Sequence, residues 1–114
     1  MFIGFEGDEI KYIGSSKPVV EGSADDIIIE ADTVTSGFID SHSHIGMARS
    51  VEPGKEEEAN EQMKTIYPLV NSLHSIYMDD PSFGESVESG VIYSTVLPGS
   101  GNIIGGKAVL VRNF

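Results

Sequence analysis

The sequence predicts an α/β fold in which a short β-strand region precedes a strand, a helix and a second strand. Two apolar runs, at 2–5 and 10–13, flank turn residues near the N-terminus. A strand-like stretch at 37–44 and a β-branched, aromatic run at 91–97 enclose a long segment that contains a helix. Such a βαβ unit pairs its two strands in parallel through a right-handed crossover. We therefore expect a partial small β domain over residues 1–36 and the βαβ unit over residues 37–114.

In the N-terminal region, Gly7 and Asp8 suit the turn of a hairpin between the first two apolar runs. Further on, Ile27, Ile28 and Ile29 form a continuous β-branched run. A run of this kind predicts a buried strand.

The segment between the two strands of the βαβ unit has a helical pattern of apolar residues that Pro68 interrupts. The acidic residues at 56–58 are expected on a solvated face at its start. We expect two helical pieces, or one helix and an extended arm. A short helix follows, with Asp80 as N-cap, Pro81 in the first turn and Gly90 just past the end. The apolar positions of the interrupted pattern are Met63, Ile66, Tyr67, Val70, Leu73, Ile76 and Tyr77.

Two of the three histidines, His42 and His44, lie one residue apart on the first strand of this unit. Side chains alternate along a strand, so Asp40, His42 and His44 are expected on one face. The two imidazoles would be roughly 6.6 to 6.8 Å apart along the backbone and could converge on one metal ion. The alternative is a pair of partly exposed polar side chains without a ligand.

The whole stretch Gly37–His44, Gly-Phe-Ile-Asp-Ser-His-Ser-His, resembles the first barrel strand of the amidohydrolase superfamily. The resemblance implies that this chain holds a partial β-sandwich and the first βαβ unit of an incomplete (β/α)8 barrel. It also implies a divalent metal, most simply zinc, on His42 and His44, with Asp40 as a supporting residue. The reaction implied is metal-dependent hydrolysis of a C–N bond in a small-molecule amide or cyclic amide.

A glycine-rich loop at 98–106 precedes an expected last strand at 107–112. It does not fit a dinucleotide-binding loop, because Ile104 replaces the third glycine and a strand follows. The loop resembles the segment after the second barrel strand in imidazolonepropionase-like amidohydrolases. That resemblance implies a substrate-side loop made of Gly99, Ser100, Gly101 and Asn102. A purely structural turn is the alternative.

The other ligands of the family, a lysine, two further histidines and an aspartate, come from later barrel strands. His74 matches none of them. We therefore expect weak or no metal binding by this chain alone, and no activity without the rest of the barrel. The alternative function is a non-catalytic α/β module for oligomerisation or binding. Unpaired strand edges predict a homo-oligomer or a complex with a second, complementing chain.

Composition limits the partners and the environment. Seven basic and 18 acidic residues give a net charge of -11, which disfavours nucleic acid and anionic membranes as partners. No apolar run approaches the roughly 18 residues of a membrane span, and we expect a cytoplasmic protein. The absence of cysteine excludes disulfides and thiolate ligands, so a metal site must use nitrogen and oxygen.

Overall fold

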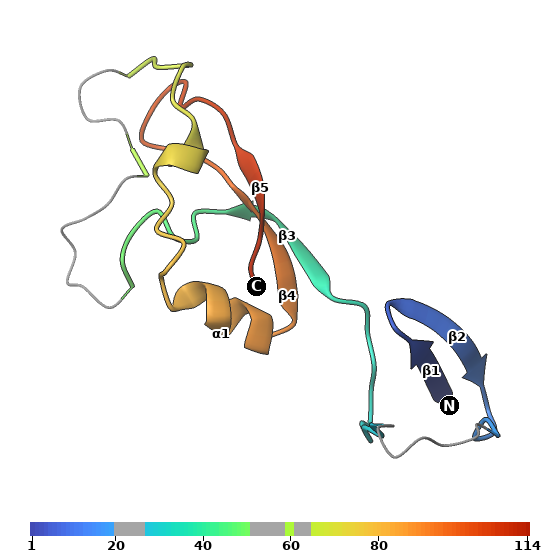
Figure 1. The fold of residues 1–114 in the computed structure, drawn as a ribbon. Helices are drawn as coiled ribbons and strands as arrows, with labels where there is room; N and C mark the ends of the chain where they lie inside the picture. Colours follow the sequence, from blue (N-terminus) through green and yellow to red (C-terminus); the bar gives the residue numbers. More distant parts are fainter. Residues whose placement is uncertain (20–26, 51–58, 61–64) are drawn as a thin grey trace. The chain divides into compact units, whose positions relative to one another are not determined.

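The computed structural model describes residues 1–19, 27–50, 59–60 and 65–114. The chain divides into two compact units, Met1–Val34 and Thr35–Phe114 (Figure 1). No helix in the described parts of the chain has the length and apolar character needed to cross a membrane.

The first unit contains the predicted hairpin. Strands β1 (Phe2–Glu6) and β2 (Glu9–Gly14) pair in antiparallel register, with Ile3 opposite Ile13. The turn between them falls at Gly7 and Asp8, as expected. The two-stranded sheet buries little, and Ile13 is 63% exposed.

The predicted buried strand at Ile27–Ile29 is wrong. These residues belong to no strand, and their exposed fractions are 86%, 72% and 84%. β-branched residues favour an extended backbone, but a strand also needs a neighbouring edge that accepts its hydrogen bonds and an apolar surface that covers its side chains. In the described part of this unit, the only sheet is the β1–β2 hairpin.

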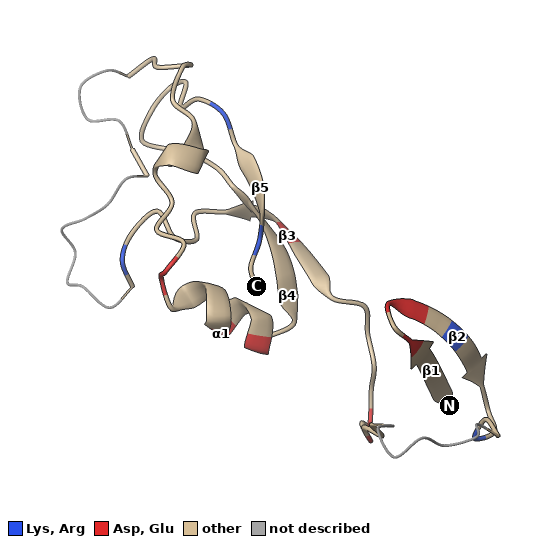
Figure 2. Cartoon of the chain, in the orientation of Figure 1, with Lys and Arg blue, Asp and Glu red and all other residues tan. Residues whose placement is uncertain are grey.

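The second unit is built on a three-stranded sheet in the order β3-β4-β5. β3 (Phe38–Ser43) pairs in parallel with β4 (Val91–Val96), as predicted, and β5 (Val109–Arg112) pairs antiparallel with β4. Figure 2 shows that β3 and β4 are almost free of charged side chains, with Asp40 as the charge on β3. The unit is therefore α/β, with strands outnumbering helices in its described part.

The predicted short helix is present as α1 (Ser82–Glu88). The N-cap is Pro81, one residue after the predicted Asp80. The side chain of Asp80 nevertheless accepts a hydrogen bond from the backbone N–H of Ser82 at 3.0 Å, which satisfies one of the free donors of the first turn. Gly90 ends the helix with φ of 85°, a left-handed conformation that favours glycine. Phe83 points from the helix into the core and is 5% exposed.

Of the two arrangements predicted around Pro68, two helical pieces is wrong, because residues 65–77 form the alternative, an extended arm, with a single 3-10 turn at Ser72–His74. The backbone groups of this arm bond to the segment before β5 instead of to a helical neighbour. Tyr67 donates to the carbonyl of Ile104 at 2.9 Å, and Lys107 donates to the carbonyl of Val70 at 2.8 Å. The prediction for Met63 and for the acidic residues at 56–58 lies outside the described residues.

The core of the second unit links the sheet to the loops at one end of its parallel strands. Met47 follows β3, Val96 ends β4, and Phe83 covers them from α1. The buried core residues are Met47, Ala59, Phe83, Val96 and Val111, with Ile45, Ile76 and Val109 packed against them. The residues that follow the histidine pair are therefore fixed by the core.

Candidate metal and substrate site

His42 and His44 lie next to each other where β3 ends. Their ring centroids are 5.7 Å apart, and the ring planes are nearly perpendicular, at 87°. Both side chains are exposed. The predicted proximity of the two imidazoles is therefore present in the structure.

The strand beneath the pair is irregular. Asp40 pairs with Ser94 and Ser43 with Val96, so β3 uses three steps where β4 uses two. An extra residue in one strand is a β-bulge, which redirects the side chains at that point and occurs often beside functional sites. The register of β3 against β4 thus shifts at the histidine pair, and the two imidazoles lie adjacent there.

His44 is attached to the end of the neighbouring strand. Its Nδ1 atom lies 2.7 Å from the carbonyl oxygen of Leu97, the residue after β4. The backbone N–H of Leu97 in turn donates to the carbonyl of Ser43 at 2.9 Å. A carbonyl oxygen only accepts hydrogen bonds, so in the neutral imidazole Nδ1 carries the proton and Nε2 keeps its lone pair. His44 therefore offers Nε2 to a metal ion.

Asp40 interacts with the backbone of the pair. Its Oδ1 atom accepts a hydrogen bond from the N–H of His42 at 3.0 Å. This contact fixes the strand at the bulge. A role for the carboxylate toward a metal stays a prediction.

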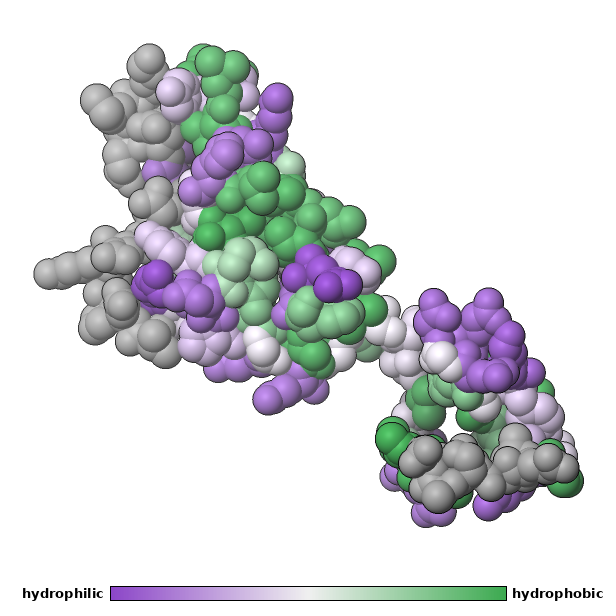
Figure 3. All heavy atoms as spheres, in the orientation of Figure 1, coloured by the Kyte–Doolittle hydropathy of each residue, from purple (hydrophilic) through white to green (hydrophobic). Residues whose placement is uncertain are grey.

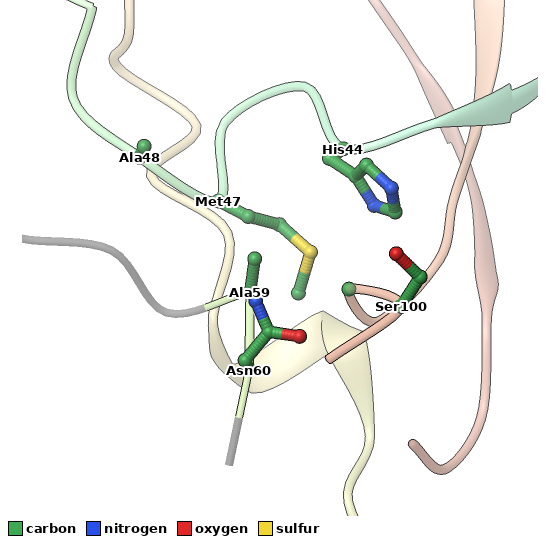
Figure 4. A pocket seen from close by; sticks show the side chains of 7 residues that line it. His44, Met47, Ala48, Ala59, Asn60 and Ser100 are labelled. Carbon is green, nitrogen blue, oxygen red and sulfur yellow. The ribbon is translucent and has the colours of Figure 1, made fainter. Parts of the chain in front are cut away.

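A cavity of about 280 Å³ lies beside His44 (Figure 4). Three segments form it: the turn after β3, the residues 59–60 and the loop after β4. The lining residues are His44, Met47, Ala48, Ala59, Asn60, Gly99 and Ser100. Of the predicted loop residues, Gly99 and Ser100 line the cavity, whereas Gly101 and Asn102 do not.

Asn60 is a lining residue that the sequence analysis did not identify. Its Oδ1 atom accepts a hydrogen bond from the N–H of Gly101 at 2.7 Å. In the sequence, Asn60 comes shortly after the acidic residues 56–58, and such a run is typical of a solvated surface. The glycines on both sides of Ser100 do indicate a close neighbour, but nothing in the sequence says which residue it is.

The loop that leaves the site is anchored by a buried carboxylate. Asp80 is 3% exposed, and it accepts hydrogen bonds from the N–H and the hydroxyl of Ser50 at 2.7 and 2.8 Å. Burial alone would raise the pKa of Asp80, but the hydrogen bonds from Ser82 and Ser50 outweigh it and hold the pKa well below its ordinary value. Asp80 is therefore ionised in the folded protein and ties the loop after His44 to the start of α1.

The histidine pair supplies at most two of the ligands that a metal site would need. Among the residues that the structure describes, no group of three or more histidine or carboxylate side chains could hold a metal ion. His74, in the 3-10 turn of the arm, therefore does not join His42 and His44 as a third ligand. Catalytic zinc sites in general have three protein ligands.

No family model matches the chain. It is 33% identical over 106 residues to the amidohydrolase tasK of Hapsidospora irregularis, an alignment that covers 91% of this chain and 11% of that protein. The crystal structure of an amidohydrolase from Thermotoga maritima MSB8 superimposes with a TM-score of 0.73 at 21% identity, over 98% of this chain and 29% of that one. The chain thus spans less than a third of each relative's length. Within that span, the two comparisons confirm the predicted resemblance to the amidohydrolase superfamily.

Proposed function

We propose that this chain supplies the first metal-binding strand of a metal-dependent amidohydrolase that cleaves a C–N bond of a small-molecule amide or cyclic amide. The observation that carries the proposal is the pair His42 and His44, with centroids 5.7 Å apart beside a cavity. Both relatives are named amidohydrolases, and this supports the proposed reaction class.

The pair has the chemistry of half a zinc site. Two nitrogens on one tetrahedral zinc ion lie about 3.3 Å apart, and rings at the observed separation can bring their Nε2 atoms that close. In the neutral imidazole, the hydrogen bond to Leu97 places the proton on Nδ1 and leaves the lone pair of Nε2 available to a metal ion. A bound divalent ion would lower the pKa of a water molecule and polarise the carbonyl of the substrate. In this chain, His42 and His44 would hold the ion, and Asp40 would keep the strand in place.

The missing ligands would come from the remainder of the barrel, in the same polypeptide or in a second chain. A complete barrel takes roughly 250 residues. β3 is hydrogen-bonded on one side to β4 and has no other neighbour among the described strands. Phe38 and Ile39, the first two residues of β3, are 55% and 63% exposed. An additional strand and helix packed there would cover both residues and pair the edge.

The second candidate is a non-catalytic module for oligomerisation or binding. It is favoured by the apolar side chains on the surface of the second unit, which Figure 3 shows on the visible face. Exposed patches of this kind mark interaction surfaces. The exposed apolar residues there include Phe38, Ile39, Ile66, Leu69, Leu73, Ile103 and Leu110. This candidate predicts self-association without a metal site.

Calorimetric titration of the full chain with Zn²⁺ separates the two candidates. We expect weak binding, with one site, that the double variant His42→Ala/His44→Ala abolishes. His74→Ala is the matched control, because it removes the third histidine and leaves the pair intact. Measurable zinc binding that is equal in the double variant and in the wild type would contradict the proposed role of the histidine pair and favour the non-catalytic module.

A further inference from the structure

The two residues that flank Ser100 are each hydrogen-bonded to the segment 59–60. The N–H of Gly99 donates to the carbonyl of Ala59 at 2.6 Å. The N–H of Gly101 donates to Oδ1 of Asn60 at 2.7 Å. Both backbone neighbours of Ser100 are therefore fixed to residues 59–60, and Ala59 is itself part of the core.

Asn60 also explains why Ser100 is flanked by glycines. A Cβ atom on Gly99 would lie 2.5 Å from Oδ1 of Asn60, and a Cβ atom on Gly101 would lie 2.6 Å from the same atom. Neither glycine has a positive φ, so backbone conformation does not require glycine at these positions. A Cβ atom at either position would instead displace the amide group of Asn60 from its present place.

The fixed loop directs a hydroxyl group into the cavity. In Figure 4 the oxygen of Ser100 points toward the imidazole of His44, with Asn60 on the other side of the loop residues. A hydroxyl can donate to a carbonyl oxygen and accept from an amide N–H. Both groups occur in an amide bound beside His44.

We infer that Asn60 is a positioning residue, which fixes the loop Gly99–Gly101 so that the hydroxyl of Ser100 faces an amide substrate beside His44. The inference rests on the proposed function for the nature of the ligand. The contact between Asn60 and Gly101 and the orientation of Ser100 can be tested without a metal or a substrate.

The test is NMR spectroscopy of the ¹⁵N,¹³C-labelled full chain. Asn60→Ala should speed the hydrogen exchange of the Gly101 amide about fivefold to tenfold, because one hydrogen bond is lost. Asn60→Asp keeps an acceptor at Oδ1 and should restore slow exchange. Ser100→Ala is the matched control, since it removes the hydroxyl but leaves the Gly101 hydrogen bond, and its exchange should stay slow.

The positioning role has its own spectroscopic signature. Ser100→Ala should shift the imidazole resonances of His44, and Asn60→Ala should shift them in the same direction while Asn60→Asp does not. A purely structural Asn60 would change stability without reproducing the effect of Ser100→Ala on His44. Unchanged His44 resonances in Asn60→Ala would overturn the inference.

Combining Gly101→Ala with Asn60→Ala tests the contact between these two residues separately from any general folding defect. Gly101→Ala alone should disturb the loop, because its Cβ meets Asn60. In the Asn60→Ala background the same change should have little further effect. Additive effects of the two substitutions would overturn the inference. The amide exchange and the His44 resonances are measured without metal, whereas zinc titration of the wild type tests the proposed function. Failure of this inference and failure of the proposed function can therefore be told apart.

Discussion

Nδ1 of His44 lies 2.7 Å from the carbonyl oxygen of Leu97, so the imidazole that follows β3 is held by the residue that follows β4. The contact joins the two parallel strands at the end where the cavity lies. It determines which nitrogen of the neutral ring is available to a ligand, because a backbone carbonyl can only accept a hydrogen bond and Nδ1 must therefore carry the proton. The tautomer of the neutral His44 imidazole is thus set by the protein itself.

The tautomer of His44 is the first prediction. At pH about 9, where imidazoles are in general neutral, long-range ¹H–¹⁵N correlation spectra should show the proton of His44 on Nδ1. His74 serves as the internal comparison, since it is exposed and lies in the 3-10 turn instead of at the end of β3. A His44 spectrum with the proton on Nε2 would contradict the hydrogen bond to Leu97 and the availability of Nε2.

Removal of the Asp80 carboxylate should destabilise the second unit. Asp80→Ala leaves the N–H and hydroxyl of Ser50 and the N–H of Ser82 without their acceptor, and we expect a loss of about 2 to 3 kcal/mol in the free energy of unfolding. Urea unfolding followed by circular dichroism measures this free energy for the wild type and the variant. Asp79→Ala is the matched control, because the neighbouring carboxylate is 72% exposed and forms a surface ion pair with Arg49. That change should cost less than about 1 kcal/mol. Equal losses for the two variants would contradict the anchoring role.

The stabilisation from Asp80 should depend on pH. Its pKa is lower in the folded protein than in the unfolded chain, so the stabilisation is fully present above the unfolded value of about 3.9 and is lost as the pH falls below it. Asp80→Asn keeps an acceptor but removes the charge, and it should be less stable than the wild type by about 1 to 2 kcal/mol at pH 7. The difference should shrink between pH about 5 and pH 2. Unfolding curves measured across that range test this, and a difference that grows toward low pH would contradict it.

The sequence predicts those elements whose determinants are local. The β1–β2 hairpin follows from two apolar runs and a turn at Gly7 and Asp8, and α1 follows from Asp80 and Gly90. The parallel pairing of β3 with β4 was also predicted, because two strand-like runs separated by a helix have few other arrangements.

Elements whose determinants are distant were predicted wrongly or only as one of two alternatives. The apolar spacing around Pro68 is helical, yet Tyr67 and Val70 bond to Ile104 and Lys107, which are more than 35 residues away. Ile27–Ile29 has strong strand propensity but no strand beside it in the described part of the unit. Local propensity is a weak guide where tertiary contacts decide the hydrogen bonding.

The candidate site was predicted in part for the same reason. His42 and His44 are close in sequence, so their proximity could be inferred. The cavity joins His44 with Asn60 and Ser100, which lie 16 and 56 residues further along the chain. Only the fold brings these three residues to one place, and the sequence holds no sign of the contact between Asn60 and Gly101.

Two glycine substitutions should have opposite effects on stability. Gly46, two residues after His44, has φ of 72°, and a Cβ atom there would lie 2.7 Å from Cε2 of Phe83. Gly46→Ala therefore combines an unfavourable backbone conformation with a clash in the core, and it should cost about 2 kcal/mol or more. Gly84 lies inside α1, and a Cβ atom there would meet nothing within 4 Å.

Gly84→Ala should raise the free energy of unfolding by about 0.5 to 1 kcal/mol, because alanine loses less backbone entropy than glycine in a helix. Both variants are measured by urea unfolding under the same conditions. If Gly46→Ala were as stable as Gly84→Ala, the turn after His44 would not be packed on Phe83. The core would then not hold the histidine pair beside the cavity, since Met47 and Phe83 are what connect that turn to β4 and α1.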